Sequence, residues 1–349
     1  MRHGRVTGVR RAWPGAVELD VTVDGDAAVA LAYPALVGTP EPGDAVLLNT
    51  TAVSLGLGTG GYHLVVAVPD RLPPDREGPG HLVKARYTPL QATVLGVSEE
   101  ASPHRDALAA ATTVGGMPVV VADLHSALPA VLVGIRERRR GARVAYVMTD
   151  GGALPLWLSR TVAAVRPLLA GTVTAGQAFG GDLEAVTLHE ALLAARVVLE
   201  ADVTVVTQGP GNLGVGTPWG FSGVAAGDAV NAVAALGGRP VASLRLSDAD
   251  PRERHRGVSH HSRTAYGVVA LARADVVVPV LDEPLASAVE ADLGAIRERH
   301  DVHAVDASHL LEPLRRSGLP LETMGRGLGE DTAYFLAAAA AGWHAAGLG

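Results

Sequence analysis

The sequence contains no cysteine. Disulfide bonds, cysteine-ligated zinc and thiol nucleophiles are therefore excluded. Lysine is nearly absent as well, since Lys84 is the only lysine among the 29 lysine and arginine residues. Aromatic residues make up 4% of the chain, and the formal net charge is −7. A chain with this charge is not expected to have nucleic acid or an anionic membrane as a partner.

Long apolar runs are missing too. The first residues, MRHGRVTGV, contain no apolar signal core, and the alanine-rich segment 335–348 is too short and too weakly apolar to span a bilayer. We therefore expect a cytoplasmic protein with no membrane partner. With 349 residues, 48% of them hydrophobic and 19% charged, the chain is long enough for two domains and a sizeable core.

Two regions of different character divide the chain. Residues 1–69 contain short alternating segments separated by turn signals, such as 17–23 before the dipeptide Asp24-Gly25. They predict a small β-barrel-like domain, which lacks the interleaved basic and aromatic residues of a nucleic-acid-binding barrel. Residues 70–80 are rich in proline, glycine and charge and are interpreted as a linker. Residues 81–349 are expected to form an α/β domain that holds the ligand crevice.

In this second region, apolar segments with strand character alternate with helical segments. That order is typical of a three-layer, mostly parallel, Rossmann-like α/β fold. In such sheets, ligands bind beyond the carboxyl ends of the strands, where we expect polar residues to converge on one crevice. The expected strands are 92–97, 117–122, 143–148, 171–175, 203–207, 240–246 and 275–280, and the expected helices are 127–139, 183–200, 224–236 and 332–346.

The segment 208–223, QGPGNLGVGTPWGFSG, is the most informative stretch, with six glycines in sixteen residues. Glycine-rich backbone between a strand and a helix commonly holds an anion on its amides. The dinucleotide fingerprint GxGxxG occurs in it, but the chain runs on through 215–220 before the helix, and the downstream acid is missing. The alternative is a structural loop packed by Trp219 and Phe221. The expected ligand-binding residues are Gln208, Gly209, Gly211, Asn212, Gly214, Gly216 and Thr217.

Residues 248–264, DADPRERHRGVSHHSRT, form the most concentrated polar run. Histidine can transfer protons or bind a metal near neutral pH. We expect His260 or His261, with Asp248 or Asp123, to provide acid–base chemistry. Adjacent histidines on a strand would point to opposite sides, so that one of them faces the site.

Further anion contacts are expected outside the glycine-rich segment. Arg254 and Arg256 lie in the same polar run, Gln177 follows the strand 171–175, and Arg326 lies between glycines before the last helix. Arginine binds phosphate and carboxylate through its planar fork of donors. The alternative for the polar run is a solvated loop in which a serine caps a helix.

A divalent metal is a further possibility at the strand ends. Its candidate ligands are Asp123, His125, Asp248, Asp250 and His260, which carry the imidazole and carboxylate groups that such ions bind. No local spacing such as HExxH supports a metal site.

Other polar residues have simpler interpretations. Asp182 is expected to cap the helix that begins beside it, Lys84 to lie at the surface, and His189 to be a packed or surface residue of a helix. Ser126 and Ser222 lack the GxSxG context of a nucleophilic serine.

Four strings in the chain resemble a known family. LVKARYTPLQ, GQAFGGDLEAV, VTVVTQGPGNLGVGTPWGFSG and DPRERHRGVSHHS are similar to the bacterial family named domain of unknown function 3866 (DUF3866), and the resemblance extends over nearly the whole chain. The family brings no known activity, substrate or catalytic residue. It implies a single two-part architecture in a bacterial, cytoplasmic protein.

Together these features predict a protein that binds a small anionic ligand, bearing phosphate or carboxylate, at the glycine-rich strand ends. Histidine and aspartate would support hydrolase or transferase chemistry there. The alternative is a non-catalytic ligand-sensing or assembly protein. The alanine-rich helices 224–236 and 332–346 could pack closely in a homo-oligomer.

Overall fold

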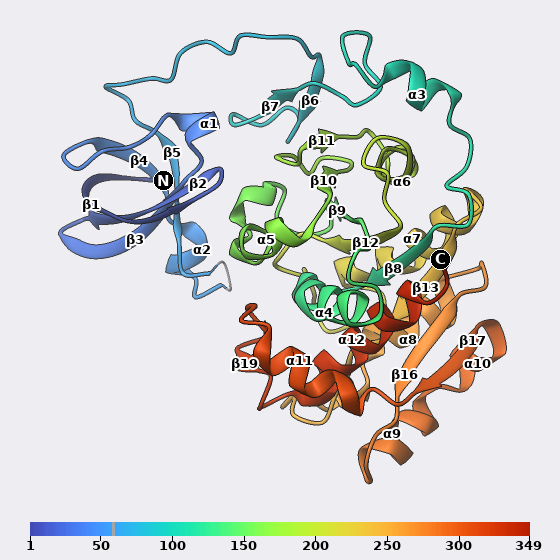
Figure 1. Cartoon of the computed structure of the whole chain (residues 1–349). Helices are drawn as coiled ribbons and strands as arrows, with labels where there is room; N and C mark the ends of the chain where they lie inside the picture. The colour runs from blue at the N-terminus through green and yellow to red at the C-terminus, as the bar shows by residue number, and fades with distance from the viewer. Residues whose placement is uncertain (58–59) are drawn as a thin grey trace.

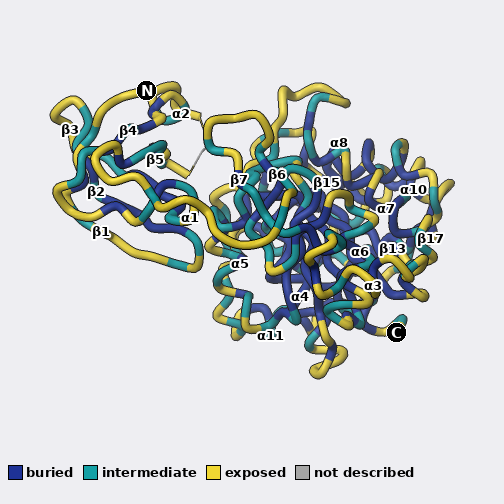
Figure 2. The backbone as a smooth tube through the Cα atoms, turned by 90° about the horizontal axis from the view of Figure 1, so that it is seen from above, coloured by how far each residue is buried: buried dark blue, intermediate teal, exposed yellow. Residues whose placement is uncertain are grey.

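The computed structural model describes residues 1–57 and 60–349. It consists of a closed five-stranded barrel beside a parallel eight-stranded sheet covered by helices (Figure 1). Buried residues are concentrated in the sheet part, whereas much of the barrel surface is exposed (Figure 2). The predicted fold class is confirmed.

The strands of the barrel pair in the order β1-β2-β3-β5-β4. Asp24 (φ 54°) and Gly25 (φ 96°) both adopt the left-handed conformation that a two-residue hairpin turn requires, so the predicted hairpin forms between β2 and β3. Alternate apolar residues such as Leu19 and Val21 fill the interior. The elements are β1 Arg2–Trp13, β2 Ala16–Val23, β3 Asp26–Ala32, α1 Pro34–Val37, β4 Ala45–Asn49, α2 Thr51–Ser54 and β5 His63–Ala67.

Aromatic side chains join the barrel to the sheet part. Trp13 Nε1 donates a hydrogen bond to the carbonyl of Trp157 at 2.7 Å, and the ring of Tyr33 lies 6.1 Å from that of Trp157. Gly15 (φ 85°) passes so close that a Cβ there would lie 2.2 Å from the Trp157 ring. The barrel is therefore held at a fixed place beside the segment that carries Trp157.

A small hairpin lies between the two parts. It pairs β6 Leu82–Lys84 with β7 Ala92–Val94 and is followed by α3 Arg105–Ala110. The expected strand 92–97 is thus shorter, and it lies outside the main sheet.

Lys84 on this hairpin is fully buried, so the expectation of a surface lysine is wrong. Its Nζ donates to the carbonyls of Ala178 at 2.9 Å and Ala185 at 2.8 Å and lies 3.5 Å from Glu184 Oε2. Burial lowers the pKa of Lys84 and raises that of Glu184. The one lysine therefore fastens the hairpin to the loop between two strands of the main sheet.

The main sheet has the order β11-β10-β9-β12-β8-β13-β16-β17, with all neighbours parallel. The strands are β8 Pro118–Ala122, β9 Val144–Thr149, β10 Gly171–Thr174, β11 Leu183–Glu184, β12 Val203–Gln208, β13 Arg239–Ser243, β16 Asp275–Pro279 and β17 Asp301–Val305. Six of them fall within a few residues of the expected strands. The edge strands β11 and β17 were not anticipated, and β11 occupies the start of the segment 183–200 that was expected to be a helix.

Helices cover both faces of the sheet. One core contains α4 and α12, and the core on the other face contains α6 and α7. The helices of this part are α4 Leu128–Arg138, α5 Arg160–Val165, α6 Leu188–Val197, α7 Ala225–Ala235, α8 His260–Thr264, α9 Leu285–Asp292, α10 Gly294–Arg299, α11 Leu311–Arg316 and α12 Thr332–Ala346. Two short hairpins pair β14 Leu246–Ser247 with β15 Gly257–Val258, and β18 Glu322–Thr323 with β19 Arg326–Gly327.

The alanine-rich helices pack inside the chain. A Cβ on Gly134 of α4 would lie 1.9 Å from the carbonyl oxygen of Ala339, and one on Gly342 of α12 would lie 2.1 Å from that of Val131. Most of α12 is buried in this way, and Ala226, Ala229 and Ala232 of α7 are buried against the sheet. These small-residue faces pack against other elements of the same chain, so they give no argument for an oligomer.

Asp182 does not cap α6, which is a correction to the sequence interpretation. The helix begins five residues later, where Thr187 Oγ1 accepts a hydrogen bond from Glu190 N. Asp182 instead accepts from the amide and hydroxyl of Thr172 and pairs with Arg166 at 2.8 Å. It closes the loop between β10 and β11.

Neighbouring strands β8 and β12 send their chains to opposite faces of the sheet. β8 continues into α4, and β12 continues into α7. Divergence of this kind opens a crevice beyond the carboxyl ends of the two strands. Asp123 directly follows β8 and Gln208 ends β12, so both lie at this point.

A histidine cluster at the carboxyl edge of the sheet

The polar run 248–264 is shaped by the β14–β15 hairpin and by the start of α8. The hairpin returns the chain so that His255, at the end of the connecting loop, comes next to the first turn of α8. Ser259 is the N-cap of α8, and its Oγ accepts from His261 N at 3.2 Å. The same Oγ lies 2.7 Å from His255 Nδ1. The buried Ser259 therefore contacts both the loop that carries His255 and the first turn of α8.

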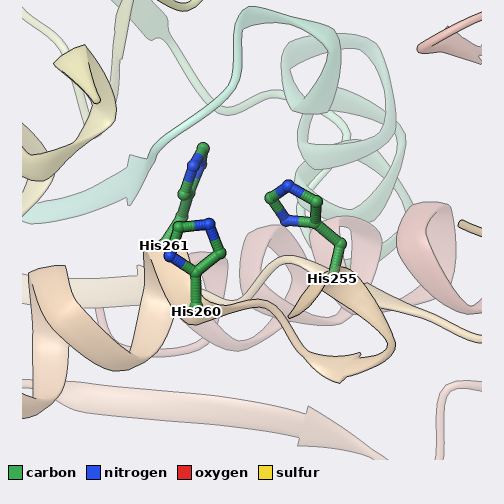
Figure 3. Close-up of side chains that lie close together, drawn as sticks. All are labelled: His255, His260 and His261. Atoms are coloured by element: carbon green, nitrogen blue, oxygen red, sulfur yellow. The ribbon is translucent and has the colours of Figure 1, made fainter. Parts of the chain in front are cut away.

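Three histidine side chains meet at this place (Figure 3). One ring nitrogen from each of His255, His260 and His261 lies within 4.8 Å of the other two. The ring centroids are 4.4 Å apart for His260 and His261, and 4.9 Å from His255 to each of them. The expectation that only one of the adjacent histidines faces the site is wrong, because they begin a helix rather than lie on a strand.

The environment leaves one nitrogen of each ring for a ligand. His255 Nδ1 is engaged by Ser259. His261 Nδ1 lies 3.4 Å from each of Arg245 Nη1, Asn212 Nδ2 and Asp123 Oδ2, so Nε2 is the remaining nitrogen of both rings. His260 Nε2 is buried without a hydrogen-bond partner among the described residues. Phe221 stacks on the His261 ring at 3.9 Å and an angle of 2°, which holds that ring in place.

His255 and His260 are held in the neutral form. Burial, together with the charges of Arg245 and Arg252, lowers the pKa of His255 to about 2. Burial also lowers the pKa of His260 to about 4, together with His261 and Arg254. Neutral imidazole is the form that binds a metal, and three imidazoles are a common ligand set for zinc.

Acceptor oxygens without partners lie beside the cluster. Asp123 Oδ2 and Gln208 Oε1 are both buried and accept no hydrogen bond from the described residues. Both residues line a small cavity between β8, β12 and α7, with about 10 Å³ of free space, enough for the centre of one water molecule. The lining contains none of the three histidines. Asp123 therefore connects two separate features, the cavity and the histidine cluster.

The glycine-rich segment folds into a short hairpin rather than an open cradle. Gly214 pairs with Phe221, and Val215 N donates to the Gly220 carbonyl at 2.9 Å. Gly209 N donates to the carbonyl of Thr149, and Leu213 N donates to Ser222 Oγ. These amides are committed inside the protein, so the cradle expected over Gly209–Gly216 is not formed by the segment as a whole. The left-handed residues Gly211 (φ 85°) and Gly216 (φ 81°) shape the exposed arm of the hairpin, which also holds Thr217.

Asn212 fastens the hairpin to its surroundings. Its Oδ1 accepts from Gln208 Nε2 at 2.9 Å, from Ser222 Oγ at 2.8 Å and from Gly223 N at 3.0 Å. Gln208 Nε2 also donates to the Asp123 carbonyl at 2.8 Å. These two expected ligand contacts thus hold the strand ends together, with Asn212 Nδ2 3.4 Å from His261 Nδ1.

Asp250 does not fit the predicted metal ligand. Its Oδ2 pairs with Arg252 at 2.9 Å, with Arg326 at 3.2 Å and with Arg245 at 3.3 Å. Three guanidinium groups around one buried carboxylate repel a cation. They also occupy Arg326, which binds Asp331 as well and is therefore not a free anion contact.

Arg254 remains the best placed of the predicted anion contacts. It is exposed, and an atom at the Cβ position of Gly216 would lie 3.8 Å from its Nη2. Its charge also acts on His260. Arg256 is exposed too, but its Nε donates to the carbonyl of Asp250.

The other predicted residues lie elsewhere or are already engaged. His125 is buried with both ring nitrogens bonded, to Tyr146 Oη at 2.9 Å and to Ser159 Oγ at 2.6 Å, so it is not a metal ligand here. Gln177 Oε1 accepts from Arg86 N. Asp248 is exposed, and Asp123 is the acid that faces His261.

From the sequence, we did not single out His255 or Arg245, and Phe221 was expected only to pack the glycine-rich loop. His255 precedes the His260-His261 pair by five residues, and a strand interpretation of that run would not bring them together. The serine at 259, considered only as a cap, was the signal that a helix starts between them.

This fold and this cluster define a two-part α/β protein with three histidines gathered at the carboxyl edge of a parallel sheet. Its chain belongs to the family described as protein of unknown function DUF3866, whose model matches residues 29–342. The match leaves out β1, β2 and the start of β3 and includes the rest of the barrel and nearly all of the sheet part. No curated protein and no solved structure matches the chain. Within the described residues, the search for a helix long and apolar enough to cross a membrane found none.

Proposed function

We propose that the protein is a metal-dependent hydrolase or transferase that acts on a small substrate bearing phosphate or carboxylate. The observation that carries this proposal is the convergence of His255, His260 and His261, each with a nitrogen within 4.8 Å of the others. These residues would hold a divalent transition metal such as zinc through Nε2 of each ring. Three protein ligands leave a coordination position open for water or substrate.

Asp123 would support such a centre through its contact with His261. Its Oδ2 lies 3.4 Å from His261 Nδ1 and accepts no hydrogen bond from it, so a metal bound at Nε2 would leave Nδ1–H free to donate to this carboxylate. A metal with an open position lowers the pKa of bound water and can supply a nucleophile at neutral pH. The buried Gln208 Oε1, beside the same aspartate, is an acceptor able to orient a water molecule.

The anionic part of the substrate would be held by Arg254. Its guanidinium lies next to Gly216 on the exposed arm of the glycine-rich hairpin. A side chain at Gly216 would approach this guanidinium, and the left-handed backbone there favours glycine. The net charge of the chain is negative, so this local positive charge is a specific feature and not part of a general basic surface.

A thermal-shift screen of the zinc-loaded protein tests the proposal. The panel consists of small phosphate esters and small carboxylates, and a ligand at one hundred times its dissociation constant should add about 2.7 kcal/mol of stability. Arg254→Ala should remove the shift while leaving zinc binding intact. His189→Ala, on the exposed face of α6, is the matched control and should change neither result. Zinc binding with no shift from either class of ligand would contradict the anionic substrate.

A specific observation favours one second candidate, a non-catalytic assembly or ligand-sensing protein. The hairpin exposes Leu213 (70%), Val215 (79%) and Trp219 (61%) beside the cluster. Exposed apolar side chains gathered on one arm are typical of a contact surface. If assembly is the role, light scattering should show an oligomer that Trp219→Asp dissociates. A monomer at all concentrations would remove this candidate.

A further inference from the structure

A second group of metal-binding side chains lies at the opposite end of the sheet. Asp275 is the first residue of β16, whereas the histidine cluster lies beyond the carboxyl ends of the strands. Asp275, His303 of β17 and His344 of α12 each place one ligand atom within 4.8 Å of the other two. The two sites share no residue, so the arguments for them are independent.

The sheet register explains why these residues meet. Asp275 and Val277 alternate along β16 and point to the same face, and His303 is the partner of Val277 in the parallel pairing. Val277 belongs to the core formed with α4 and α12. His303 and Asp275 therefore face α12, whose last turns carry His344.

The contacts within the group all converge on one carboxylate. His344 Nε2 lies 2.9 Å from Asp275 Oδ2, and His303 Nε2 lies 3.2 Å from Asp275 Oδ1. The rings of His303 and His344 are tilted by 35° with centroids 4.7 Å apart. Arg239 Nη2 donates to Asp275 Oδ2 at 3.5 Å, and the Arg239 side chain is half exposed.

One nitrogen in this group has no hydrogen bond. His303 Nε2 is buried, and its approach to Asp275 lacks hydrogen-bond geometry among the described residues. The remainder of the His303 side chain is 40% exposed, so solvent can reach the group. Two imidazoles and one carboxylate that leave positions open to water are a ligand set for Fe²⁺, Zn²⁺ and related ions.

We infer that Asp275, His303 and His344 form a second divalent transition-metal site, which clamps the C-terminal helix to the outer strands of the sheet. β17 is an edge strand that pairs only with β16. A metal bound here ties α12 to both β16 and β17 at once. The cation also lies by the C-terminal turns of α12, where the helix dipole favours positive charge.

The test uses the full chain with His260→Ala and His261→Ala, which removes the first cluster. Isothermal titration with Zn²⁺, and visible absorbance with Co²⁺, should show one equivalent of metal bound by this background. Adding either His303→Ala or His344→Gln should abolish that binding. The added His309→Ala is the matched control, since His309 is an exposed histidine that contacts α12 through Trp343 but lies outside the group.

A stability readout supports the clamp. Zn²⁺ should raise the Tm of the background variant and of its His309→Ala form, and it should leave the Tm of the His303→Ala form unchanged. Circular dichroism confirms that each variant is folded, and two different ligand substitutions guard against a failure of one of them. The inference is overturned if the background binds no metal, or if binding survives both His303→Ala and His344→Gln.

Discussion

His261 Nδ1 lies 3.4 Å from Asp123 Oδ2, although one residue lies in the first turn of α8 and the other follows the central strand β8. The contact joins the polar run 248–264 to the point where the chains leaving β8 and β12 diverge. Through this contact, Asp123 at the carboxyl edge of the sheet belongs to the histidine site.

Asp123→Asn should weaken zinc binding at the histidine cluster by about 10–100-fold, because the carboxylate that can accept from Nδ1–H of a metal-bound His261 is replaced by a neutral amide. Competition with a chelator of known affinity measures the change. Asp248→Asn, on the neighbouring exposed loop, is the control and should leave the affinity unchanged. Equal effects of the two substitutions would contradict the role given to Asp123.

Asp250→Ala should destabilise the protein by about 3–5 kcal/mol, because it leaves the buried Arg245 without its carboxylate partner. Urea unfolding of the metal-free protein gives the free energy of unfolding. Asp248→Ala should change it by less than about 0.5 kcal/mol. A small cost for Asp250→Ala would show that the arginines around it are adequately solvated.

The same carboxylate predicts a pH dependence. Burial alone would raise the pKa of Asp250, but hydrogen bonds from Arg252 and the charges of Arg252 and Arg245 bring it well below the ordinary value. Arg326 also faces it, and Asp331 lies beyond Arg326. A pKa lowered in the folded state adds stability that is present above the unfolded pKa of about 3.9 and is lost as pH falls through the folded pKa.

The stability difference between wild type and Asp250→Asn should therefore be constant above about pH 5 and should shrink in stronger acid. Unfolding measured over a pH series for both proteins checks this. A difference that grows as pH falls would have the wrong sign for this account.

Lys84→Met should cost about 3–5 kcal/mol of stability, because Glu184 and the carbonyls of Ala178 and Ala185 lose their common donor. The double variant Lys84→Met with Glu184→Gln should cost less than that, since no buried charge is then unpaired. Urea unfolding compares the two. A double variant less stable than the single one would show that the ion pair is not the main contribution.

The sequence predicts much of this fold because its signals are local. Apolar β-branched runs such as 203–207 mark the buried parallel strands, and Asp24-Gly25 marks a hairpin turn. Asp123 was identified for a sound physical reason, since it directly follows a central strand. Strand β17 was missed because its sequence, DVHAV, carries a histidine and an acid and does not read as a buried run.

The candidate site is only partly visible in the sequence. His260 and His261 were chosen, but His255 joins them only through the turn around Ser259. We expected Asp250 to be a metal ligand because the sequence does not show which arginines neutralise it. One of these arginines, Arg326, is distant in the sequence. The glycine-rich segment suggested an anion cradle, whereas many of its amides pair across the hairpin, a long-range property that composition does not reveal.

The most direct test is a Zn²⁺ titration of the His303→Ala protein, in which the histidine cluster at the carboxyl edge is the one remaining three-residue group identified among the described residues. We predict one equivalent of tightly bound Zn²⁺, lost in each of the added variants His255→Ala, His260→Ala and His261→Ala and retained with His189→Ala. A protein that binds no Zn²⁺, or that binds it equally well without His255 and His260, would contradict the central claim.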